Sequence, residues 1–314
     1  MKKMSIGDII RKYNLVILLL VFIIIASVLS PNFLTARNFL NLLQQSSITG
    51  VVAIGMTLVI ILGGIDLSVG SVAAFAGMIT AIMINGGFHP VIAVAAGLVL
   101  GAALGGISGI LAARFKLPDF IATLAMMEAA RGAALLVTSG VPVFGLTGGF
   151  RFIGGGFVKG VSVSGIIWIL LTILVMLMLK YTSFGRSLYA IGGNKEAAML
   201  SGIKVKRNYA ITYIICAGLA AFGGILTASW LAAGQPTACD GMELDAIAAA
   251  VIGGASLSGG MGTVVGTFGG VFLLQIITNI FNLIGLESSY QQIAKGAIIV
   301  MALLLNKSVM NKKS

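Results

Sequence analysis

The chain has 314 residues, of which 58% are hydrophobic and 9% are charged, and its mean hydropathy is +1.08. A soluble globular domain carries roughly 25% charged residues, so this composition excludes an ordinary soluble protein and favours one built for lipid. The net charge of +11 would suggest nucleic-acid binding in a soluble protein, but in a membrane protein it is typical of a cytoplasmic excess of Lys and Arg. Two cysteines, Cys216 and Cys239, are too few for a disulfide framework.

Apolar stretches follow one another along the chain and predict an all-α membrane protein with about ten transmembrane helices. The basic N-terminal segment resembles a signal peptide, but it lacks a convincing cleavage site, so we expect a retained first helix. The eighth stretch is too short to cross the hydrocarbon alone, and we expect it either to begin within the preceding QPTACDGMEL segment or to be a broken helix. The stretches lie at about 15–30, 46–62, 69–85, 90–113, 119–138, 163–180, 209–232, 244–256, 263–284 and 289–305.

Small residues are abundant within these stretches, and the chain has 43 glycines. The segment GAALGGISGILAA, residues 101–113, places small residues four positions apart. This spacing lets helix backbones approach closely in lipid, so we expect tight helix packing here.

The distribution of basic residues predicts the orientation. With a cytoplasmic N-terminus and ten spans, fifteen of the 20 Lys and Arg residues fall in cytoplasmic segments, three fall outside, and two, Arg131 and Lys295, fall inside spans. This asymmetry favours ten spans with both termini in the cytoplasm.

Two glycine–serine segments interrupt the apolar pattern. GGIDLSVGS starts at Gly63, and its echo GGASLSGGM starts at Gly253. Repeated glycine interruptions in the two halves of a transporter indicate a binding or gating region. The alternative is a pair of tight turns between helices, and the two interpretations are compatible if the turns line the path.

Five ionisable residues lie within or next to the stretches. Glu128 and Arg131 are three positions apart on one predicted helix and could neutralise each other. Asp66 and Asp245 lie near break and entry points, so we expect them to be solvent-exposed. Lys295 lies inside the last stretch and must find an acceptor or reach water.

The longest loop between stretches runs from Lys180 to Ala210 and predicts a short cytoplasmic helix. Asn194 would be its N-cap and Glu196 would lie in its first turn, both of which are favourable. Such a helix either lies on the membrane surface or docks on a partner.

Neither nucleotide nor metal chemistry has a sequence signal here. The chain has no GxxxxGK[ST] phosphate loop, and its single histidine, His89, has no metal-ligand spacing to Cys or carboxylate residues. We therefore expect no cofactor and no metal site, and energy must come from a partner or an ion gradient.

Several long motifs resemble the permease subunits of bacterial ribose-type sugar ABC importers. The resemblance extends over nearly the whole chain, and its EAA-then-glycine element is similar to the coupling loop of ABC importers. Cys239 and Asp240 depart from the family pattern, which has small residues there. The motifs are GGIDLSVGS, FIATLAMM, TSFGRSLYAIGGNKEAAMLSGI and QPTACDGMELDAIAAAVIGGASLSGG.

The resemblance implies a type II importer fold in the bacterial cytoplasmic (inner) membrane, with residues 1–314 forming a single permease domain. Two copies would form a homodimeric pore surrounded by lipid, cytoplasmic ATPase subunits would bind the coupling loop, about 181–208, and an extracytoplasmic binding protein would deliver the sugar. The chain itself would be no enzyme, and nucleic acid is no expected partner. The coupling residues would be Arg186, Asn194, Glu196, Ala197, Ala198 and Gly202, and the outer docking residues would be Gln235, Pro236, Asp240 and Glu243.

The residues of the two breaks suit a neutral polyol, which needs hydroxyls, amides and a smooth wall rather than a counter-charge. We expect the breaks to flank or hinge an inner gate that the coupling helix moves. The alternatives are an ion-coupled sugar carrier, which a convincing carboxylate relay would favour, and a membrane scaffold without transport. The expected path or gate residues are Gly63, Gly64, Asp66, Ser68, Gly253, Gly254, Ser256, Ser258, Asn279 and Asn282.

Overall fold

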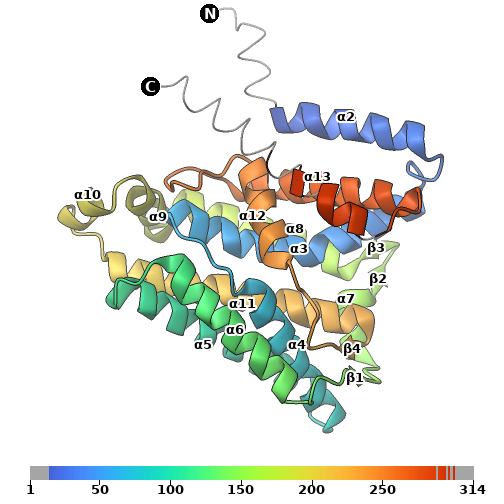
Figure 1. The fold of residues 1–314 in the computed structure, drawn as a ribbon, viewed down its shortest axis with the longest axis horizontal. Coiled ribbons are helices and arrows are strands. Elements are labelled where there is room, and N and C mark those ends of the chain that lie inside the picture. Colours follow the sequence, from blue (N-terminus) through green and yellow to red (C-terminus); the bar gives the residue numbers. More distant parts are fainter. Residues whose placement is uncertain (1–13, 288, 295, 298–299, 301–314) are drawn as a thin grey trace, which may run out of the picture.

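The computed structural model of the protein describes residues 14–287, 289–294, 296–297 and 300. Helices make up most of the described chain, and many of them run along the long axis of the molecule (Figure 1). They are α2 (Asn14–Leu29), α3 (Ala36–Leu62), α4 (Val69–Asn85), α5 (Pro90–Arg114), α6 (Asp119–Leu136), α7 (Gly149–Gly155), α8 (Val163–Tyr181), α9 (Ser183–Gly193), α10 (Lys195–Leu200), α11 (Val205–Leu231), α12 (Met242–Ile252) and α13 (Val264–Leu283).

Four two-residue strands were not expected from the sequence. Strand β1 (Val143–Phe144) pairs antiparallel with β4 (Ala233–Gly234), and β2 (Phe157–Val158) pairs antiparallel with β3 (Val161–Ser162). All four lie at the end of the molecule opposite α9 and α10 (Figure 1). Backbone groups in the segments between helices have no helical hydrogen-bond partner, and the strand pairs provide partners for some of them.

The helix bounds confirm most of the predicted stretches. Five helices, α3, α5, α8, α11 and α13, are long and apolar enough to cross a membrane, and α2 and α4 are shorter apolar helices. The eighth stretch forms only the 11-residue α12, which begins at Met242 after a non-helical segment. The predicted last stretch is described only in part, and Lys295 lies outside the described residues.

Helix α3 begins ten residues earlier than its apolar stretch. Its first turns contain amides and serines that a purely apolar criterion excludes, but two glutamines among them find partners inside the protein. Gln44 Nε2 donates to the Gly154 carbonyl at 3.0 Å, and Gln275 Nε2 donates to Gln45 Oε1 at 2.8 Å. Thr35 caps the helix by accepting from the Asn38 amide.

Helix α11 lies at the centre of the molecule and packs against α3, α4 and α5. The α5 face that contacts it carries Gly97, Gly101, Gly105 and Gly109, all buried. A methyl group at Gly109 would lie 2.9 Å from the Ala210 Cα, and one at Gly105 would overlap the Tyr213 carbonyl oxygen. The predicted close packing through small residues four apart is therefore confirmed, and we call this contact the α5–α11 seam.

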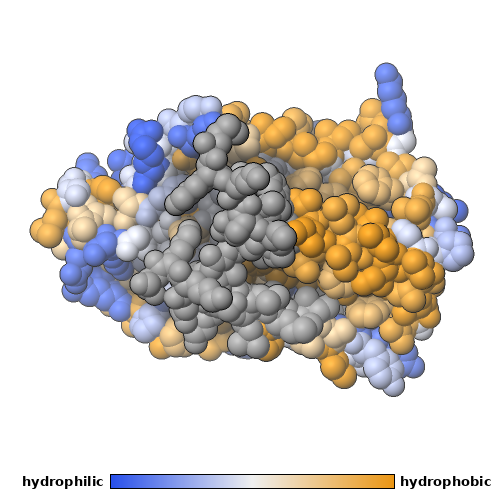
Figure 2. Space-filling view, turned by 90° about the horizontal axis from the view of Figure 1, so that it is seen from above, coloured by the Kyte–Doolittle hydropathy of each residue, from blue (hydrophilic) through white to orange (hydrophobic). Residues whose placement is uncertain are grey.

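Polar residues gather at the two ends of the molecule. Figure 2 shows hydrophilic residues at the end that carries α9 and α10, with a broad hydrophobic surface beyond it. Eight described Lys and Arg residues belong to that end, in the α5–α6 connection and in the segment from Lys180 to Arg207, whereas Arg37, Arg151 and Lys159 lie at the opposite end. The apolar band between two polar ends is what a bilayer requires.

Candidate functional site

The two predicted breaks meet in the structure at one point, which also includes the end of α9. The first break, residues 63–68, follows α3, and the second break, residues 253–263, joins α12 to α13. The Gly260 amide donates to the Ile61 carbonyl at 2.9 Å, which joins the second break to the last turn of α3, just before the first break. A methyl group at Gly192 of α9 would overlap both of these hydrogen-bonded groups. We call Gly63, Gly192, Gly259 and Gly260 the glycine junction.

Three of these four glycines, including Gly260 with φ +71°, have a backbone conformation that favours glycine. Gly63 ends α3 with φ +92°, and Gly259 has φ +83°. Both values lie in the left-handed region, which side chains other than Asn and Asp rarely adopt. A methyl group at Gly259 would also lie 2.7 Å from the Gly192 carbonyl oxygen. The junction therefore brings three chain segments into backbone contact.

Helix α9 is fixed to the second break by a side chain as well. Tyr189 Oη donates to the Gly262 carbonyl at 2.8 Å, and burial raises the pKa of Tyr189, so its hydroxyl stays a donor at physiological pH. On the same helix Leu188 and Ile191 are fully buried in the main core. Sequence reasoning missed α9, although Thr182, which caps it by accepting from the Gly185 amide, was a usable signal.

The predicted short helix of the loop is α10. Asn194 is its N-cap and accepts from the Ala197 amide at 2.9 Å, and Glu196 lies in its first turn, as expected. Ala198 is buried, but Met199 and Leu200 are 62% and 86% exposed. Two large apolar side chains at a polar end of the molecule form a surface that a partner could cover.

The remaining predicted coupling residues lie in α10 or next to it, at the surface. Arg186, Glu196 and Ala197 are exposed. Gly202 has φ +81° and open space around it, so a side chain there would point into solvent.

The first break holds a buried carboxylate, which contradicts the expectation of solvent exposure for Asp66. Its Oδ1 accepts from the Ser68 amide at 2.9 Å and from Ser68 Oγ at 2.6 Å, and both residues are fully buried. Its Oδ2 has no hydrogen-bond partner. Next to it, Thr123 Oγ1 of α6 donates to the Ile65 carbonyl at 3.2 Å, so α6 helps to hold the break.

The second break is stabilised by its own serines and by α13. Ser256 is buried, and its Oγ accepts from the Ser258 amide at 3.3 Å. Gly253 packs backbone to backbone against Gly266, and Gly254 has φ +94°.

Two predicted path residues lie away from the breaks, near the other end of α13. Asn279 is buried and exchanges two hydrogen bonds, at 3.0 and 2.9 Å, with the Asn38 amide group. Asn282 Oδ1 accepts from Gln291 at 2.9 Å. Both amides thus connect helices at this end, and the structure does not bring them together with Gly63 or Gly253.

The segment 235–241, which contains three of the four predicted docking residues, turns back into the molecule, and Glu243 follows it in α12. The segment leaves β4 near the end of α4, and its Cys239 carbonyl and the Glu243 carboxylate lie against Gly70, at the start of that helix. Pro236 is buried, Gln235 and Glu243 are half-buried, and the Asp240 side chain is 87% exposed. Of the four residues, Asp240 is therefore the most accessible to a partner in this single chain.

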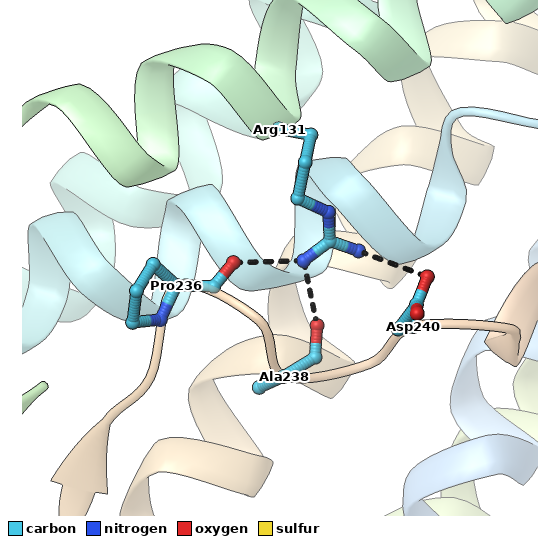
Figure 3. Close-up of polar contacts among 4 residues, drawn as sticks. All are labelled: Arg131, Pro236, Ala238 and Asp240. Carbon is cyan, nitrogen blue, oxygen red and sulfur yellow. Dashed lines mark hydrogen bonds and ion pairs between the residues drawn. The ribbon is translucent and has the colours of Figure 1, made fainter. Parts of the chain in front are cut away.

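Arg131 of α6 holds this segment in place (Figure 3). Its Nη1 donates to the Pro236 carbonyl at 2.8 Å and to the Ala238 carbonyl at 3.0 Å, and its Nη2 lies 3.9 Å from Asp240 Oδ1. The expected ion pair with Glu128 does not form, because the guanidinium is turned to these carbonyls. Glu128, three residues before Arg131 on α6, is exposed.

No metal site is present among the residues that the structure describes, since no three His, Cys, Asp or Glu side chains come together there. Cys216 and Cys239 are both free, so no disulfide joins them.

Comparison with known proteins places this architecture in a family. Residues 38–303 match the family described as "Branched-chain amino acid transport system / permease component". The chain is 44% identical over 308 residues to the ribose import permease protein RbsC of Bacillus subtilis, covering 98% of this chain and 96% of the relative. It is 44% identical over 301 residues to RbsC of Escherichia coli K12, covering 95% and 92%.

A further relative is the L-arabinose ABC transporter permease protein AraH of Azospirillum brasilense, at 34% identity over 311 residues, which are 98% of this chain and 91% of the relative. No solved structure matches the chain significantly. The family match covers most of the chain, and the identities extend over nearly its full length. The chain therefore belongs to the branched-chain amino acid transport system / permease component family.

Proposed function

We propose that this chain is the permease subunit of an ATP-driven importer for ribose or a related monosaccharide in the bacterial inner membrane. The named relatives include ribose and L-arabinose permeases. The observation that carries the mechanism is the glycine junction, because α9 contacts both breaks at once. A force applied to the α9–α10 segment therefore reaches the first and the second break through backbone contacts.

The partner at the α10 end is proposed to be a separate cytoplasmic ATPase subunit. The exposed side chains of Met199 and Leu200 offer an apolar surface, and Arg186 and Glu196 provide charges beside it. Within the loop of about 181–208, α10 would receive the movement that ATP binding produces, and α9 would pass it to the breaks. An extracytoplasmic sugar-binding protein would dock at the opposite end, where Gln235 follows β4.

We further propose that the single permease domain, residues 1–314, has ten spans of the type II importer class, with both termini in the cytoplasm. The concentration of basic residues at the α9–α10 end supports this orientation, since such residues accumulate on the cytoplasmic side.

A second copy is proposed to complete the sugar path. Glu128 is exposed near the middle of the 18-residue α6. A carboxylate that faces hydrocarbon is energetically costly, so we expect this face of α6 to contact a polar path or a partner rather than lipid. The inner gate would be formed by Gly63, Gly64, Asp66, Ser68, Gly253, Gly254, Ser256 and Ser258, whereas Asn279 and Asn282 would hold the outer end of α13.

The test is uptake of a labelled pentose by liposomes that contain this chain, its ATPase and its binding protein. We expect uptake to require ATP and the binding protein and to persist when a proton ionophore is present. Uphill uptake by the chain alone, abolished by the ionophore, would instead identify an ion-coupled carrier.

Coupling through α10 is tested by Gly202→Asp. A charged side chain at this open, exposed position should reduce co-purification of the ATPase at least tenfold. Gly285→Asp is the matched control, because Gly285 also has a positive φ, +73°, and open space, but follows α13 at the other end. Equal ATPase recovery from both variants would show that the ATPase does not dock here.

A further inference from the structure

A cavity of about 600 Å³ opens between the start of α9 and the start of α11, within the loop of about 181–208 that is proposed to couple to the ATPase. It lies at the basic end of the molecule, just past the point where α8 ends. Its lining residues are Ser183, Phe184, Ser187, Ser201, Gly202, Ile203, Lys204, Arg207, Asn208 and Ile211.

The polar part of this cavity is suited to an anion. Lys204 and Arg207 provide two positive charges, and no carboxylate is among the lining residues. The hydroxyls of Ser187 and Ser201 donate to the carbonyls of Ser183 and Ala197. In the described part of the chain, neither basic residue takes part in an ion pair. Helix α11 begins here without a side-chain cap on its first amides, which adds a partial positive charge.

The apolar part continues from the cavity along one face of α11. Ile211 lines the cavity, and Ile214 and Gly218 follow it at helical spacing on the same face. Neither is buried, and the space around Gly218 is open. By contrast, Tyr213 and Ala217, on the opposite face, are fully buried in the core. An apolar stripe thus leads from the polar cavity toward the hydrophobic band of the molecule.

We infer that this cavity binds an anionic phospholipid, with its phosphate at Lys204 and Arg207 and an acyl chain along the Ile211–Gly218 face of α11. A basic pocket between helices at a membrane surface is a known form of headgroup site. Free phosphate would make no use of the apolar stripe. An acidic segment of a soluble partner would not reach along it into the bilayer.

The test measures lipid retention by the purified full-length chain, using native mass spectrometry with phosphatidylglycerol and phosphatidylcholine of the same acyl chains. We expect a preference for phosphatidylglycerol, and we expect the double variant K204Q/R207Q to weaken its binding roughly 30-fold. The matched control is K116Q/K206Q, which removes the same charge from exposed residues at the same end that do not line the cavity. The control should bind as the unchanged chain does.

A second variant tests the cavity without a change of charge. Ser187→Trp should fill the space and weaken phosphatidylglycerol binding, while the protein still elutes as a single species. Equal lipid binding by K204Q/R207Q and its control would overturn the inference. So would displacement of the lipid by millimolar inorganic phosphate, or a loss of ATPase association in K204Q/R207Q with lipid binding unchanged. The last result would assign the cavity to the ATPase.

Discussion

Gly192→Ala tests whether the glycine junction connects α9 to the breaks. The added methyl group would overlap the Ile61 carbonyl oxygen and the Gly260 nitrogen, two backbone atoms that hydrogen-bond each other at 2.9 Å. Overpacking costs about 1–3 kcal/mol and a lost hydrogen bond about 0.5–1.5 kcal/mol. We therefore expect the free energy of the conformation in which α9 contacts both breaks to rise by roughly 2–4 kcal/mol.

An increase of that size shifts the equilibrium away from the docked conformation by roughly 30- to 900-fold. In liposomes with the ATPase and the binding protein, sugar uptake per ATP hydrolysed should fall at least tenfold. The chain alone should also lose its monodisperse elution at a lower temperature, a measurement that needs no partner.

Gly193→Ala is the matched control for this variant. Gly193 is the next residue of α9, and a methyl group there would meet no atom within 4 Å. It should keep both uptake and thermal stability. If Gly192→Ala equals this control in both measurements, the contact between α9 and the breaks is not structurally important and the proposed mechanism is wrong.

Two further predictions concern packing and the 235–241 segment. Gly105→Ala should lower the free energy of unfolding by about 1–3 kcal/mol, because its methyl group would overlap the backbone of α11. Gly106→Ala is the control and should change stability little, since a methyl group there meets only side-chain atoms, the nearest at 3.4 Å. Equal thermal stability of the two variants would contradict the α5–α11 seam. Arg131→Gln removes both carbonyl contacts and should speed the labelling of Cys239 by a thiol reagent. Glu128→Gln, on the same helix, is the control and should leave the labelling rate unchanged. An unchanged labelling rate in Arg131→Gln would show that Arg131 does not hold the segment.

The sequence predicted the helices well wherever lipid or core packing requires an unbroken apolar run. Helix α4 has the predicted bounds, and α12 is the short element that its length required. The start of α3 was missed because Gln44 and Gln45 have partners more than 100 positions away in the chain, and no local pattern reports such hydrogen bonds. Buried polar residues are acceptable in a helix only when a distant partner satisfies them.

The candidate site was predicted in its parts but not in its arrangement. Glycine and serine patterns indicated both breaks, and Asn194 indicated the start of α10. The hydrogen bond between Gly260 and Ile61 joins residues from the two halves of the chain. Gly192, which packs against both of these residues, belongs to α9, a helix that was not predicted from the sequence. Asp66 was expected in solvent because it is charged, yet it is buried, with two donors from Ser68 on Oδ1 and none on Oδ2.

The α5–α11 seam also limits how this protein can change shape. Backbones that touch at glycines every fourth residue cannot slide past each other by one residue without driving side chains such as Leu104 or Ile107 into the contact. The two helices therefore behave as one rigid unit. Any conformational change that opens or closes a path has to occur in the elements packed around this unit, so movement can be accommodated at the breaks rather than within the longest helices.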